Sequence, residues 1–189
     1  MVPSTLQAEG ANGKGALIRS VAWDNNGSDP DRAYSKGGKN SPKSIAMRSA
    51  GKLFLGSYTC THSGNGISDE TYTEGYEFTS RPSELTGMYT YTAKGDDTNG
   101  TAHVTIENRD GGATTVLAEK RIALNPVSSF TKFTIPLNYT NTELKATHIK
   151  VMFTSSNKSS YDQADETSNI QTVNNLSLIH ISEPTRHSL

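Results

Sequence analysis

The chain has 189 residues, and 18 Lys and Arg against 19 Asp and Glu give it a net charge of −1 at pH 7. A nearly neutral chain of this length fits one domain and offers no strong field for nucleic acid or anionic lipid, so polyanion binding is disfavoured. No apolar run approaches the roughly 20 residues of a transmembrane segment, and a single cysteine, Cys60, excludes an intrachain disulfide.

Short alternating segments recur along the chain between clusters of Gly, Asn, Asp, Pro and Ser, whereas helical periodicity is scarcely visible. This pattern predicts antiparallel β-sheet. Strands are expected at 16–23, 44–49, 53–61, 75–79, 85–92, 102–107, 114–122, 130–137 and 147–154. Residues 1–15 are expected to form a lead-in or linker, and residues 16–175 a single β-sandwich domain.

Three of these segments carry the clearest apolar stripes, and each stripe predicts a strand with one face in a core. In the last of them, Ile149, Val151 and Phe153 alternate with side chains that should face solvent. Three half-buried strands favour a sandwich or a barrel. Residues 108–112, which are rich in Asn, Asp and Gly, predict a hairpin-like turn.

The last residues of the chain stand apart from this pattern. Residues 176–186 read Leu-Ser-Leu-Ile-His-Ile-Ser-Glu-Pro-Thr-Arg, which is the translation, in one frame, of a transposase end followed by a sequencing adapter. We therefore expect residues 176–189 to be a non-native tail with few specific contacts, and the final strand of the domain to be missing. The alternative is a natural final strand, because Leu-Ser-Leu-Ile alternates weakly.

Four spaced elements appear in a recognisable order: Gly75-Tyr76-Glu77-Phe78-Thr79-Ser80-Arg81-Pro82, Leu85-Thr86-Gly87-Met88-Tyr89-Thr90-Tyr91, Phe133-Thr134-Ile135-Pro136-Leu137 and Ala146-Thr147-His148-Ile149. With these elements, residues 16–175 resemble the PCMD family of carbohydrate metabolism domains. The resemblance implies an antiparallel jelly-roll β-sandwich similar to carbohydrate-binding modules. It also implies a secreted or cell-surface protein, such as a lipoprotein, with an upstream immunoglobulin-like domain in the full protein. The chain departs from the family in ending before a closing strand with a V-D-D-like motif.

Sugar recognition needs aromatic faces that stack on C–H groups, together with planar polar side chains that bind vicinal hydroxyls. Tyr89 and Tyr91 share one face of a predicted strand, and Arg81 lies at the entrance to that strand. Trp23 and Tyr34 flank a polar loop. These five residues are the candidate ligand-binding side chains. The alternative is that the aromatic residues pack in the core and that Arg81 pairs with a local carboxylate.

Residues 24–31 supply many hard oxygen atoms, with Asp24, Asn26 and Asp29 as weak candidates for metal ligands. Ca²⁺ takes six to eight such oxygens. The loop lacks the EF-hand pattern, so a solvated polar turn is the alternative. No motif in the sequence requires a cofactor, and a structural Ca²⁺ bound by this loop is kept as one of the two alternatives.

These features predict a non-catalytic glycan-binding module of a secreted or surface protein involved in polysaccharide utilisation, with a polysaccharide or oligosaccharide as its partner. One alternative is a glycoside hydrolase or lyase acting through carboxylates on the concave sheet, for which Glu77 and Glu107 qualify by residue type only. The other is a structural or adhesin domain. Because no Gly-x-Ser-x-Gly or His-Glu-x-x-His motif is present, an enzyme is the less favoured of these functions.

Overall fold

The computed structural model describes residues 5–19, 21–22, 48–49, 51–63, 66–93, 98–157 and 178–182. Within these ranges every regular element is a β-strand, and the strand pairs are antiparallel. Among the same residues there is no helix that is long and apolar enough to cross a membrane. The prediction of an all-β, antiparallel fold is confirmed.

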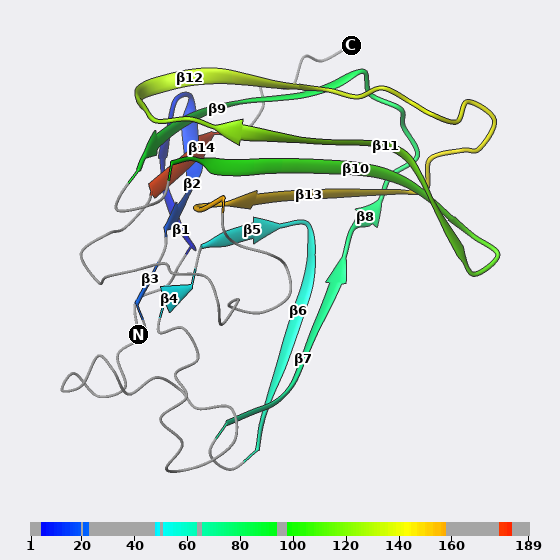
Figure 1. Ribbon diagram of the computed structural model, residues 1–189, viewed down its shortest axis with the longest axis horizontal. Helices are drawn as coiled ribbons and strands as arrows, with labels where there is room; N and C mark the ends of the chain where they lie inside the picture. The colour runs from blue at the N-terminus through cyan, green and yellow to red at the C-terminus, as the bar shows by residue number, and fades with distance from the viewer. Residues whose placement is uncertain are drawn as a thin grey trace.

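Two five-stranded units make up most of the described chain (Figure 1). The first sheet has the order β1 (Thr5–Gly10), β2 (Gly13–Arg19), β14 (Leu178–Ser182), β9 (Glu84–Thr92) and β12 (Val127–Pro136). The second has the order β11 (Ala113–Leu124), β10 (Gly100–Asp110), β13 (His148–Thr154) and β5 (Lys52–Phe54), and β8 (Tyr76–Glu77) also pairs with β13.

Two smaller pairs complete the described strands. β3 (Val21–Ala22) pairs with β4 (Arg48–Ser49), and β6 (Gly56–Ser63) pairs with β7 (Gly66–Glu74). In Figure 1 the β6–β7 hairpin, drawn in cyan to green, extends away from the two larger sheets. The segment predicted as one strand at 53–61 is divided between β5 and β6. Gly56 has a φ of 147° at this break, a conformation that side chains rarely adopt.

The hydrophobic core lies between the two larger sheets and contains the predicted apolar stripes. Phe133 of β12 packs edge-on against Phe153 of β13, with ring centroids 5.9 Å apart, which joins the two layers. Burying one such side chain contributes about 1.5–3 kcal/mol. The buried members of the core are Ile18, Tyr89, Tyr91, Ala102, Val104, Ile106, Leu117, Ala118, Leu124, Phe133, Ile135, Leu137, Ala146 and Phe153.

The turn between β10 and β11 confirms the predicted hairpin. Asp110 pairs with Ala113, so the loop consists of Gly111 and Gly112. Their φ values are 59° and 81°, and a two-residue hairpin loop of the type I′ kind requires positive φ at both positions. Glycine adopts such angles without the steric penalty of a Cβ atom. The sequence therefore fixes the register of the two longest strands of the second sheet.

The C-terminal segment differs from the expectation of a tail with few contacts. Leu178–Ser182 forms β14 in the interior of the first sheet, paired over five residues with β2 and over five with β9. The expectation that this segment makes few specific contacts is therefore wrong. Ladder hydrogen bonds come from the backbone, so any extended segment with a suitable alternation can supply them.

The first residues also differ from the expected lead-in segment. Thr5–Gly10 forms β1, which pairs with β2 in a hairpin from Thr5↔Ile18 to Gly10↔Gly13. β7 was likewise not predicted. Its sequence is rich in Asp, Glu and Thr rather than in alternating apolar residues, so the pattern on which the other strands depend is absent from it.

Candidate functional site

Several predicted site residues lie outside the described part of the chain. These are Trp23, Tyr34 and the metal-ligand candidates Asp24, Asn26 and Asp29. Among the residues that the structure does describe, no group of three or more His, Cys, Asp and Glu side chains is arranged to hold a metal ion.

Tyr89 and Tyr91 of β9 are core residues. Tyr89 is 7% exposed and packs edge-on against Phe133, with centroids 6.1 Å apart. Burial raises the pKa of the Tyr89 phenol, although a backbone hydrogen bond at Asn125 acts in the opposite direction. Tyr91 is 1% exposed, and its hydroxyl donates to the carbonyl of Ser155 at 3.1 Å. The structure therefore agrees with the core-packing alternative, since neither ring presents a face to a sugar.

Arg81 holds a loop in place through backbone carbonyl groups rather than through a carboxylate. Its guanidinium donates to the carbonyls of Thr142 at 3.0 Å, Leu144 at 3.2 Å and Asn141. It also lies over the ring of Tyr139, 4.4 Å from the centroid. Burial raises the pKa of the Tyr139 phenol, and the nearby Arg81 charge partly offsets that effect. These contacts engage the planar face and several N–H groups of Arg81.

We expect Arg81→Ala to lower the free energy of unfolding by about 1–2 kcal/mol, because half-exposed hydrogen bonds to a charged donor are lost. Arg81→Lys should recover little of this, since an ammonium group cannot donate to three carbonyls while stacking on a ring. Urea denaturation measures both effects. Lys132→Ala, at an exposed position of β12, is the control. A free energy of unfolding unchanged in Arg81→Ala would contradict the structural role of this side chain.

The face of the second sheet that points away from the core carries a set of polar side chains in register. Glu107 of β10 pairs with His148 of β13, which pairs in turn with Glu77 of β8, so these three side chains share one face. The next rows follow by alternation. We call this surface the polar face, and its members include Lys52, Glu77, His103, Thr105, Glu107, Arg109, Glu119, Arg121, His148, Lys150 and Met152. The same register also places two threonines and two apolar residues on this face, Thr101, Thr154, Phe54 and Val116.

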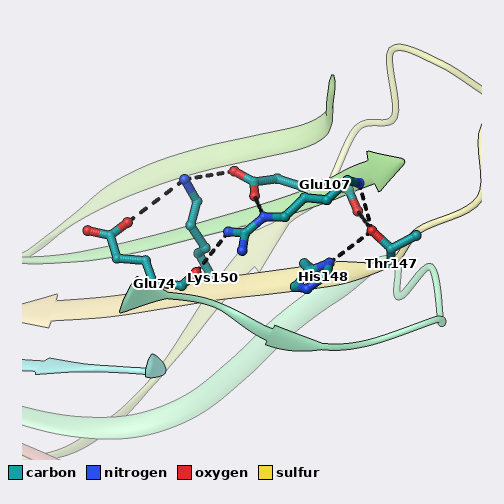
Figure 2. Close-up of polar contacts among 6 residues, drawn as sticks. Glu74, Glu107, Thr147, His148 and Lys150 are labelled. Carbon is teal, nitrogen blue, oxygen red and sulfur yellow. Dashed lines mark hydrogen bonds and ion pairs between the residues drawn. The ribbon is translucent and has the colours of Figure 1, made fainter. Parts of the chain in front are cut away.

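A buried carboxylate lies at the centre of the polar face. Glu107 is 2% exposed, and each of its oxygens has a cationic partner (Figure 2). Arg109 Nε donates to Oε2 at 2.9 Å, and Lys150 Nζ lies 2.7 Å from Oε1. Burial of a carboxylate is costly unless it is paired in this way. The two cations therefore make the burial of Glu107 tolerable.

The end of β7 covers this cluster. Arg109 Nη2 donates to the carbonyl of Glu74 at 2.8 Å, and the Glu74 carboxylate lies 3.9 Å from Lys150 Nζ. The next residue, Gly75, has a φ of 100°, and a Cβ atom there would lie 2.9 Å from Arg109 Nη2. A glycine is thus required where the backbone passes over the guanidinium.

Thr147 ties the same cluster to the start of β13 (Figure 2). Its hydroxyl oxygen accepts from the backbone N–H of Arg109 at 2.7 Å and lies 3.0 Å from His148 Nδ1. The Thr147 N–H donates to the carbonyl of Glu107 at 2.8 Å. Glu107, Arg109 and His148 are therefore held by fixed backbone positions on two neighbouring strands.

The charges around Glu107 determine its protonation. Burial alone would raise the pKa of this carboxyl, but the hydrogen bonds and charges of Lys150 and Arg109 outweigh burial and lower the pKa below its ordinary value of 4.5. Glu107 is thus ionised at neutral pH. It can accept hydrogen bonds there but has no proton to give, which disfavours a role as general acid.

Other members of the polar face are more accessible. His103 Nε2 lies 2.7 Å from Glu119 Oε1, and Arg121, opposite His103 on β11, is exposed. Glu77 is exposed as well. The donors and acceptors of these side chains, together with the exposed parts of the Arg109 and Lys150 side chains, can form hydrogen bonds with a ligand that carries hydroxyl groups.

Of these residues, the sequence pattern named only Glu77 and Glu107, by residue type, and not Arg109, His148, Lys150 or Glu119. Glu107 and Arg109 are two residues apart on one strand, which is the one signal that could have suggested a pair on a shared face. Tyr76 was also not singled out. It is 70% exposed, but it alternates with Glu77 and so lies on the opposite side of β8 from the polar face.

Comparisons of the chain with protein-family models, with curated proteins and with solved structures found no match.

Proposed function

We propose that the chain is a non-catalytic glycan-binding module of a secreted or surface protein involved in polysaccharide utilisation, and that the polar face is its sugar-binding surface. The observation that carries this proposal is the polar face itself, a fixed array of carboxylate, guanidinium, ammonium and imidazole groups on one side of a sheet. The motif resemblance to the PCMD family, and the jelly-roll sandwich that it implies, support the same function.

The chemistry of the array suits sugars. Vicinal hydroxyls both donate and accept, so a surface that alternates donors and acceptors at fixed spacing can bind them in pairs. Arg121 and Glu119 offer such groups on β11, and Arg109 and His148 offer them on β10 and β13. Trp23 and Tyr34 remain our proposed stacking residues, and Ca²⁺ in the loop at 24–31 remains a proposed structural ion.

A hydrolase is the second candidate, because Glu107 and Glu77 lie in one row of the polar face with a single strand between them. Hydrolysis needs one carboxyl group that is protonated at the working pH. The lowered pKa of Glu107 disfavours that role for it, and its two cationic partners already occupy both oxygens. Binding without cleavage is therefore the better-supported function.

The test is affinity electrophoresis of the full chain in gels that contain a β-glucan, a mannan or a xylan. We expect retention on at least one gel, with a dissociation constant between micromolar and millimolar. This range corresponds to a binding free energy of about −8 to −4 kcal/mol. Arg121→Ala should weaken retention about tenfold, since a hydrogen bond to a charged group contributes about 1.5 kcal/mol. Lys120→Ala is the matched control, as it removes a neighbouring exposed cation whose side chain alternates to the other side of β11.

Two outcomes would decide against this proposal. Equal retention of Arg121→Ala and wild type would remove the polar face as the binding surface, and no retention on any glycan would favour the structural or adhesin alternative. A reducing-sugar assay on the same polysaccharides tests the alternative function, hydrolysis. Release of reducing ends that is abolished in Glu77→Gln would establish cleavage.

A further inference from the structure

Carboxylates and Lys or Arg side chains are equal in number on the polar face and the end of β7 that covers it. Among the described residues of this surface and its β7 cover, the carboxylates are Glu74, Glu77, Glu107 and Glu119, and the cations are Lys52, Arg109, Arg121 and Lys150. Acids and bases thus balance, apart from the two imidazoles. A balanced surface offers no net positive potential to attract a polyanion.

The two central cations are the least free to bind an external anion. Arg109 donates to Glu107 through Nε and to the carbonyl of Glu74 through Nη2, and Lys150 lies between the carboxylates of Glu107 and Glu74. A ligand carboxylate or sulfate that took these donors would leave the Glu107 carboxylate buried and unpaired. Such a buried, uncompensated charge is strongly unfavourable.

His103 is similarly occupied, because its Nε2 lies against Glu119 Oε1. A hydroxyl group makes no such demand. It accepts from a partly exposed guanidinium or ammonium N–H and donates to a carboxylate oxygen without adding charge, so the internal pairs stay in place.

We infer that the polar face selects neutral glycans and discriminates against uronate-containing and sulfated ones, with Glu107 and Glu119 as the residues that set this selectivity. The inference rests on the proposed function, which it deepens. It assigns the buried Glu107 a role in specificity: the carboxylate holds Arg109 and Lys150 so that they serve as hydrogen-bond donors rather than as an anion site.

The test compares wild type, Glu107→Gln and Glu119→Gln on two sets of gels, neutral (β-glucan, mannan, xylan) and anionic (polygalacturonate, heparin). We expect wild type to be retained on a neutral gel, with less than about twofold change between roughly 50 and 500 mM NaCl, and not to be retained on an anionic gel. Each variant removes one negative charge and should gain retention on the anionic gels that is lost at high salt.

Glu84→Gln is the matched control, since it removes the same charge from an exposed position on β9 of the other sheet and should gain nothing. Thermal melts establish that each variant is folded. If Glu107→Gln does not fold, the comparison of wild type with Glu119→Gln tests the inference. The Glu119 side chain is about half exposed, at 52%, so its replacement should leave the fold intact.

Salt-sensitive retention of wild type on polygalacturonate or heparin would overturn the inferred selectivity while leaving glycan binding intact. Variants that show no gain on the anionic gels would remove Glu107 and Glu119 as its cause. No retention of wild type on any gel would overturn the proposed function, and the inference with it.

Discussion

Deleting residues 176–189 is expected to destabilise the protein strongly and to lower its melting temperature by more than about 10 °C. The deletion removes β14 from between β2 and β9, where it pairs with five residues on each side. At about 1 kcal/mol of net stability for each backbone hydrogen bond lost, the cost is several kcal/mol. That is a large share of the roughly 5–15 kcal/mol that holds a domain folded.

The deletion also exposes the facing edges of β2 and β9, and unpaired strand edges promote association. Differential scanning calorimetry and size-exclusion chromatography measure the two effects. Deletion of residues 183–189 alone is the control, because it leaves β14 in place and should change little. A chain ending at residue 175 that stayed monomeric and melted at the wild-type temperature would contradict the central position of β14.

Glu107→Ala is expected to lower the free energy of unfolding by about 3 kcal/mol, because breaking a buried ion pair leaves its partners uncompensated. We place the effect at the lower end of the usual range since Arg109 and Lys150 keep 30% and 27% of their side-chain surface exposed and can be partly solvated. Glu107→Gln keeps the shape and one acceptor and should cost less. Urea denaturation at pH 7 measures both variants, with Glu84→Ala as the exposed control.

The same carboxylate gives a pH dependence of defined sign. The pKa of Glu107 is lower in the folded protein than its ordinary 4.5, so its stabilising contribution is present above about pH 4.5 and is lost as the pH falls through the folded-state pKa. The difference in stability between wild type and Glu107→Gln should therefore shrink steadily below pH 4.5. A difference that stays constant from pH 7 into strong acid would show that folding leaves the pKa of Glu107 unchanged, which contradicts the lowering described above.

The sequence was sufficient to predict the elements that depend on local pattern. The stripes at Ala102–Val104–Ile106 and Phe133–Ile135–Leu137 are buried, and the turn with Gly111 and Gly112 closes the β10–β11 hairpin. Each of these follows from side-chain alternation or from backbone angles that glycine favours. β1 was missed although its partner β2 follows it directly, because Thr5–Gly10 is short and its only apolar residues are Leu6 and Ala8. β14 was missed because its sequence matches translated adapter DNA, and its partners β2 and β9 lie far from it along the chain.

The candidate site was harder to predict than the fold. Alternation places Tyr89 and Tyr91 on one strand face, but it does not say whether that face meets the core or a ligand, and only packing against Phe133 and the bond to Ser155 decides this. Met152 shows the converse. It was expected to face solvent opposite the apolar stripe, yet it is buried on the polar face. What covers that face depends on segments distant in sequence, such as the end of β7 over Arg109.

Chemical-shift mapping by NMR tests the proposed sugar-binding surface most directly. The isotope-labelled full chain is titrated with cellohexaose, mannohexaose and xylohexaose, and its amide shifts are followed together with the Arg Nε–Hε signals. The account predicts saturable shifts, for at least one of these sugars, at Arg109, Arg121 and His148 on the polar face, with β9 and β12 of the other sheet unchanged. Saturable shifts confined to β9 and β12, or none with any of the three sugars, would contradict it.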